Sequence, residues 1–115
     1  MEMTDCLFCK IIEGDIPSSK VYEDSDMYAF RDIEPQAPVH VLIVPKKHIA
    51  SLDECTEEDI ELLGRIVSKV QEIAKIAGIT NGYRLVSNCG EDGFQTVEHL
   101  HFHLLGGRPL LWPPG

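Results

Sequence analysis

The sequence predicts an α+β domain in which an antiparallel sheet of five strands is covered by helices on one side. Residues 57–77 repeat apolar side chains at helical spacing, and five other segments are rich in β-branched and aromatic residues. The order is three strands, the long helix and two more strands, joined by links of hairpin length. Such short links favour antiparallel pairing, and a run of strands followed by a helix is typical of α+β folds.

The first half of the chain predicts one short helix and three strands. Residues 7–13, LFCKIIE, have helix-like apolar spacing and stop at Gly14. Residues 19–25 and 27–32 predict two strands of a hairpin that turns at Asp24-Ser25-Asp26. Residues 34–38, EPQAP, cannot continue a strand interior because proline has no N–H to donate. Residues 39–45, VHVLIVP, are nearly all apolar or β-branched and predict the third strand.

The second half predicts the long helix and two more strands. Thr56 is a suitable N-cap, the acidic residues 57–59 suit the positive end of the helix dipole, and Gly78 is a suitable C-terminal stop. Residues 82–88 and 97–105 predict the last strands. The helix residues expected to face the core are Ile60, Leu63, Val67, Val70, Ala74 and Ala77.

The composition excludes several classes of function. The chain has 115 residues, with 10 basic and 19 acidic side chains and a net charge of −9, which argues against binding a nucleic acid polymer along a broad surface. No apolar stretch approaches the roughly 20 residues that span a bilayer, and the first ten residues lack the pattern of a signal peptide. We therefore expect a cytoplasmic protein without a membrane partner, whose four cysteines are thiols or metal ligands.

The stretch 98–109, EHLHFHLLGGRP, contains three of the five histidines. Because side chains alternate along a strand, His99, His101 and His103 share one face and the apolar residues between them share the other. The three imidazoles could decorate a solvent face, bind one metal ion or carry out nucleophilic catalysis. The Cα atoms of His99 and His103 would lie about 13 Å apart, so all three rings could reach one ion only with strain.

His99-Leu-His101-Phe-His103-Leu-Leu resembles the histidine triad motif, in which histidines alternate with apolar residues. Residues 30–40, residues 45–48, Asn88 and the Trp112-Pro-Pro-Gly115 ending are similar to the HINT branch of the histidine triad (HIT) superfamily. The resemblance implies a HIT-like fold with one long and one short helix, and two five-stranded sheets joined in a homodimer. It also implies a single HIT domain over 1–115, whose tail, 108–115, reaches toward the partner subunit; folding back on its own domain is the alternative.

The resemblance implies a purine nucleoside phosphoramidase. His101, the middle histidine, is expected to attack the α-phosphorus of an adenosine 5′-phosphoramidate, so that an amine leaves and water later hydrolyses the nucleotidyl-histidine to AMP. His103 is expected to hold a phosphate oxygen, His40 to position His101 and fix its tautomer, and His99 to complete the triad. A dinucleoside polyphosphate hydrolase, a nucleotide-binding scaffold and a metal-binding module are the competing functions.

The family's nucleotide-binding positions are matched by apolar side chains around the base and by polar groups around the ribose and phosphate. Asp32 matches the ribose-binding acid, and Asn88, Thr96 and the amide of Val97 match phosphate or leaving-group contacts. Structural roles are the alternative: Asp32 could cap a turn, Asn88 could close a loop, and the apolar members could be core. The set is Phe8, Phe30, Asp32, Ile33, Leu42, Asn88, Thr96, Val97, His101 and His103.

Cys6-Leu-Phe-Cys9 has the spacing of a metal knuckle, and a redox pair is the alternative. The resemblance to bacterial members implies a structural zinc ion held by Cys6, Cys9, His48 and His99, with no cofactor needed for catalysis. The chain also departs from the family. Phe94 stands where the animal members tend to have glycine and is expected to narrow the mouth near the leaving group, so the resemblance does not fix the leaving-group preference, and Thr96 replaces a serine.

Overall fold

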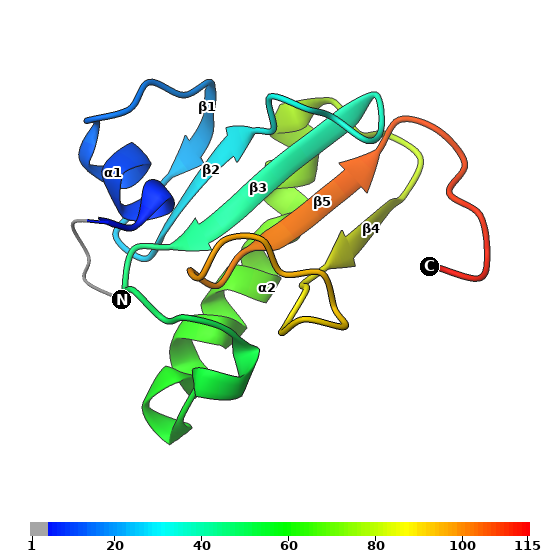
Figure 1. The fold of residues 1–115 in the computed structure, drawn as a ribbon. Helices are drawn as coiled ribbons and strands as arrows, with labels where there is room; N and C mark the ends of the chain where they lie inside the picture. The colour runs from blue at the N-terminus through cyan, green and yellow to red at the C-terminus, as the bar shows by residue number, and fades with distance from the viewer. Residues whose placement is uncertain (1–4) are drawn as a thin grey trace.

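The computed structural model describes residues 5–115 as a five-stranded antiparallel sheet with two helices (Figure 1). The sheet order is β1-β2-β3-β5-β4, and every neighbouring pair is antiparallel. Residues 1–4, which belong to the predicted domain and to the segment analysed for a signal peptide, lie outside the described part. The α+β prediction is confirmed. The elements are α1 (Leu7–Glu13), β1 (Lys20–Glu23), β2 (Met27–Arg31), β3 (Val39–Pro45), α2 (Ile60–Ala77), β4 (Tyr83–Val86) and β5 (Phe102–Gly106).

The two helices cover opposite faces of the sheet, so the prediction of helices on one side is wrong. In β2, Met27 and Ala29 pack in the core cluster with α2, whereas Tyr28 and Phe30 pack in a second cluster with α1. Figure 1 shows α2 behind the sheet. The physical reason is that β2 and β3 are apolar on both faces, and each face needs a cover. The α1 side is the one that carries the histidines.

The buried face of the long helix overlaps the predicted one only in part, and the predicted Leu63 is half-buried against the core. Val70, Ala74 and Ala77 face the core as expected, but Ile60 and Val67 are 64% and 53% exposed. Thr56 caps a short 3-10 turn, Glu57–Asp59, that leads into α2, and Gly78 ends the helix in the left-handed conformation as expected. The buried residues of α2 are Leu62, Ile66, Val70, Ile73, Ala74 and Ala77.

The histidine strand is shorter than predicted. β5 begins at Phe102, which pairs with Ile43 of β3, and its pairing with β4 starts at His103, so His99 and His101 lie in the segment before the strand. The N–H of Leu100 there donates to the carbonyl of Ile49 at 2.6 Å instead of to a strand. The predicted alternation still holds, because Leu100 and Phe102 pack toward α2 while the histidines face the α1 side. Within residues 5–115, no helix is both long and apolar enough to cross a membrane.

Candidate active site and metal cluster

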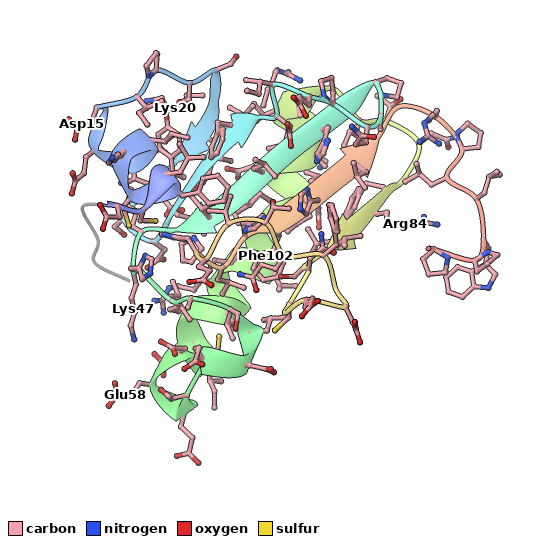
Figure 2. All side chains as sticks on the ribbon, in the orientation of Figure 1. Asp15, Lys20, Lys47, Glu58, Arg84 and Phe102 are labelled. Atoms are coloured by element: carbon pink, nitrogen blue, oxygen red, sulfur yellow. The ribbon has the colours of Figure 1, made fainter. Side chains whose placement is uncertain are left out.

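Two adjoining cavities lie on the α1 side of the sheet, with volumes of about 270 Å³ and about 590 Å³. They share Asp32, Thr96 and His103. Arg84 borders the second cavity and projects from β4 toward the C-terminal tail (Figure 2), where it donates to the carbonyl of Leu111 at 2.8 Å. The first cavity has mainly apolar walls, which include Phe8, Phe30, Ile33, Leu42 and Val97. The second has more polar walls, which include Glu34, Gln36, His40, Arg84 and Asn88.

His101 lines the first cavity and is held in one tautomer. Its Nδ1 lies 2.7 Å from the carbonyl oxygen of His99. Because a carbonyl can only accept a hydrogen bond, we infer that Nδ1 carries the proton and that Nε2 is an unprotonated lone pair. Phe8 packs edge-on against the ring, with the two ring centroids 5.0 Å apart. An imidazole held in this form is suited to nucleophilic attack.

A hydrogen-bonded chain runs from the backbone through His40 to His103. The N–H of Gln36 donates to Nδ1 of His40 at 3.1 Å, so the proton of neutral His40 lies on Nε2. Nε2 of His40 is 2.9 Å from Nδ1 of His103 and 3.5 Å from a carboxylate oxygen of Asp32. When His103 accepts at Nδ1, its own proton lies on Nε2. That atom is buried and, among residues 5–115, has no hydrogen-bond partner, so it is free to donate to a ligand.

Burial keeps these imidazoles neutral. It lowers the pKa of His103 to about 4, with the neighbouring His101 and His40 adding to the effect. Burial also lowers the pKa of His101, although the hydrogen bond to the carbonyl of His99 acts in the opposite direction and raises it in part. The pKa of His40 is lowered by burial and raised in part by Asp32. A lone pair on His101 and a donor on His103 are therefore both present near neutral pH.

Four metal-ligating side chains converge where α1 meets the sheet. Sγ of Cys6 and Sγ of Cys9 lie 3.2 Å and 3.5 Å from Nδ1 of His99. Nδ1 of His48 lies 3.3 Å from Sγ of Cys9 and 3.2 Å from Nδ1 of His99. A tetrahedral zinc ion would set nitrogen pairs about 3.4 Å apart and sulfur–nitrogen pairs about 3.6 Å apart. These four distances lie within a few tenths of an ångström of those values, and all four ligand atoms lie within 4.8 Å of one another.

The outer hydrogen bonds also suit a metal at this cluster. Nε2 of His99 donates to the carbonyl of Pro45 at 2.8 Å, which leaves Nδ1 unprotonated and directed at the two cysteines. Burial, with Cys6 beside it, raises the pKa of Cys9 to about 12, and burial lowers the pKa of His99 to about 4. A bound cation would displace the thiol protons, as zinc does on binding cysteine.

Asp32, His40 and His103 also bring three ligand atoms within 4.8 Å of one another, but they suit a metal less well. A metal-bound histidine normally donates from its other ring nitrogen. In His40 that nitrogen accepts from Gln36, so the proton remains on the nitrogen that faces the group. We therefore assign the metal-binding chemistry to the cysteine-containing cluster and a hydrogen-bond relay to this one.

The structure brings most of the residues predicted to bind a nucleotide together. All of them except Asn88 line the first cavity, and Asn88 lines the second. Asp32 borders both cavities and also accepts from the N–H of Glu34 at 2.8 Å, so it caps a turn as well. The expected contact of His40 with His101 is replaced by one with His103, and the carbonyl of His99 holds His101 instead.

Sequence reasoning missed part of the first cavity wall and the backbone groups that fix the tautomers. Ile16, Pro17 and Ser18, which follow α1, line the first cavity. Ile16 and Pro17 are ordinary apolar residues, and the Ser18 hydroxyl lies 2.7 Å from the Tyr28 hydroxyl, so their residue types did not indicate a ligand site. The same is true of the N–H of Gln36 and the carbonyl of Pro45, because any residue supplies those groups.

Comparison with known proteins gives consistent matches. The family model described as "HIT domain" matches residues 13–110. A 14 kDa zinc-binding protein of Brassica juncea is 47% identical over 113 residues, which cover 96% of this chain and all of that protein. Among solved structures, a HIT family hydrolase from Legionella pneumophila has a TM-score of 0.92 at 52% identity, covering 96% of this chain and 100% of its own. A histidine triad nucleotide-binding protein from Candida albicans has a TM-score of 0.78 at 37% identity, covering 95% and 83%.

Proposed function

The chain belongs to the HIT domain family, and from this premise we propose that it is a purine nucleoside phosphoramidase of the HINT branch. The observation that carries the proposal is the tautomer of His101, whose Nδ1 is held by the carbonyl of His99 so that Nε2 is free beside a cavity. Support also comes from the structural relatives named as a hydrolase and as a nucleotide-binding protein.

In the proposed reaction, Nε2 of His101 attacks the α-phosphorus of an adenosine 5′-phosphoramidate. The nitrogen–phosphorus bond to His101 forms as the bond to the leaving amine breaks, and the departing amine takes up a proton from solvent water. The buried N–H of His103 donates to a phosphate oxygen and stabilises the charge that develops there. Water then attacks the same phosphorus, which releases AMP and restores the lone pair of His101.

The first cavity is the proposed site of the nucleoside. Phe8, Phe30 and Leu42 offer apolar walls for a purine, and Ile33, which is 94% exposed, would be covered by it. Asp32 stands between the two cavities, where its carboxylate could accept hydrogen bonds from ribose hydroxyls. The phosphate would then lie beside His103, and the leaving amine would lie in the second cavity.

We propose a structural role for the metal cluster. Cys6 and Cys9 belong to the start of α1, whereas His48 and His99 belong to the segments after β3 and before β5. Cys6, Cys9, His48 and His99 would hold a zinc ion, which would link these segments and take no part in the phosphoryl chemistry. The name of the zinc-binding relative supports metal binding, and the grouping of the four side chains supports this position.

We propose that residues 1–115 form one HIT domain that assembles as a homodimer. Ile60 and Val67 form an exposed apolar stripe on α2, and Trp112 in the tail is 81% exposed. A second copy of the chain could bury these side chains. In the single chain the tail lies along its own domain, with Leu111 held by Arg84 and Pro114 lining the second cavity, and we propose that the tail 108–115 reaches toward the partner's site when the two copies assemble.

The test is to trap the covalent intermediate. The protein is mixed with adenosine 5′-phosphoramidate labelled at phosphorus, quenched in acid-free denaturant, and digested to find which peptide carries the label. We expect the label on His101, and we expect H101A to bind AMP in equilibrium dialysis while its turnover is lost. H103Q serves as the matched control, which should slow turnover but retain labelling at His101. Retained turnover in H101A would contradict the proposal, and a parallel assay with diadenosine tetraphosphate ranks the competing hydrolase activity.

A further inference from the structure

We propose that Phe94 forms an aromatic wall of the leaving-group subsite and makes the protein select aromatic amines as leaving groups. This inference rests on the proposed function, and it goes beyond it by assigning the class of amine. Phe94 lines the second cavity together with Asn88, Thr96 and His103.

The backbone of Phe94 is in a conformation that a bulky residue rarely adopts. Its φ is +62°, and within residues 5–115 the other positive φ angles belong to glycines. The left-handed region is unfavourable for a residue with a Cβ atom, because the Cβ crowds the following carbonyl. The side chain is also 77% exposed, so core packing does not compensate for the backbone. Folding stability therefore gives no reason for a phenylalanine here, and an outlier of this kind points to function.

The loop that carries Phe94 is held in place by several hydrogen bonds. The N–H of Phe94 donates to the carbonyl of Glu91 at 2.9 Å, and the N–H of Gln95 donates to the carbonyl of Gly90 at 3.0 Å. The side-chain amide of Gln95 donates to the carbonyls of Ala50 and Val97 at 2.8 Å and 2.9 Å. These hydrogen bonds fix the backbone at Phe94, and its Cα–Cβ bond therefore has a fixed direction.

The position of the second cavity identifies what the ring would meet. Asp32, Thr96 and His103 border both cavities, so a phosphate at His103 separates a nucleoside in the first cavity from a leaving group in the second. The second cavity brings Phe94 together with the carboxylate side chains of Asp32 and Glu34, and its arginine, Arg84, is engaged with the carbonyl of Leu111. An aromatic ring and acidic groups together suit an amine that carries an aromatic ring, since the ring can stack and the departing nitrogen becomes cationic.

The test compares three leaving amines on the same nucleotide: ammonia, 2-cyclohexylethylamine and 2-phenylethylamine, each as its adenosine 5′-phosphoramidate. The cyclohexyl compound matches the phenyl compound in size and hydrophobicity but has no π-system. We expect kcat/KM of the wild-type protein to favour phenyl over cyclohexyl about fivefold, from one aromatic contact. Phe94→Leu, which keeps an apolar side chain, should bring this ratio to about one, and Phe94→Tyr should restore it.

The outcomes separate the inference from the function on which it rests. If all three amides turn over and the phenyl-to-cyclohexyl ratio is the same in wild type and Phe94→Leu, the assignment of Phe94 is overturned and the phosphoramidase proposal stands. If the wild-type protein turns over none of the three, the proposed function is overturned and the inference with it.

Discussion

His103 should make the stability of this protein fall in mild acid. Burial, with the neighbouring rings of His101 and His40, lowers the pKa of His103 to about 4 from the ordinary value of 6.5. A group whose pKa is lower in the folded state binds more protons in the unfolded state. Between pH 6.5 and about 4, acid therefore favours unfolding, and the stabilising contribution of neutral His103 is lost as the pH falls through this window.

The magnitude follows from the two pKa values. Going from pH 7 to pH 5, an isolated group with these values would remove about 2 kcal/mol of the free energy of unfolding. His103 borders two open cavities, and solvent screening there reduces the expected effect to about 1 kcal/mol.

The assay is urea unfolding of wild type and H103Q at pH 7 and pH 5, with a chelator in both samples so that metal binding does not contribute. Glutamine keeps a polar side chain of similar size but cannot titrate. The carboxylates and the other histidines titrate in both proteins, so the difference between the two pH-dependent losses reports His103. We expect the loss between pH 7 and pH 5 to be about 1 kcal/mol smaller in H103Q. An equal loss in the two proteins would refute the reasoning that His103 is held neutral by burial.

Three further predictions concern the metal cluster and backbone packing. Cys9→Ser should reduce the bound zinc measured by elemental analysis, lower the thermal midpoint and speed hydrogen exchange in α1, because the cluster links α1 to the sheet; a full complement of zinc in the variant would contradict this. Gly64→Ala should stabilise α2 by about 0.5–1 kcal/mol, since an added Cβ meets nothing within 4 Å. Gly106→Ala should destabilise the sheet, because a Cβ atom added at residue 106 would lie 2.8 Å from Cδ1 of Ile79. A higher urea midpoint for this variant than for wild type would contradict the prediction and would mean that Ile79 moves away at no cost.

Much of the fold could be predicted where a local sequence pattern is compatible with only one type of secondary structure. Val39–Pro45 is observed with its predicted bounds, since an apolar run of strand length between prolines fits little else. Gly78 ends α2 as expected. The buried face of α2 could not be chosen from spacing, because this helix carries two apolar stripes. The stripe with Ile60 and Val67 repeats as regularly as the one with Ile66 and Ile73, and only the tertiary fold decides which is buried.

The site was predictable to the extent that side chains define it. The spacing of the histidines predicted that they face one side, and the resemblance placed Cys6 and Cys9 beside His48 and His99, which are distant in sequence. The tautomers could not be predicted, because they depend on backbone groups. The N–H of Gln36 sets the proton on His40, and the carbonyl of Pro45 sets the one on His99.

His99 shows how a run of alternating histidines can serve two purposes. Residues two apart in an extended segment share a face, so His99 and His101 both point toward α1. Phe8 packs edge-on against both rings, at centroid distances of 6.0 Å and 5.0 Å, and lies between Cys6 and Cys9 in the chain. The ring of His99 joins the metal cluster while its carbonyl fixes the proton of His101. One residue thus connects the cluster that anchors α1 to the lone pair on which the proposed chemistry depends, and a change that turns the His99 peptide should disturb both.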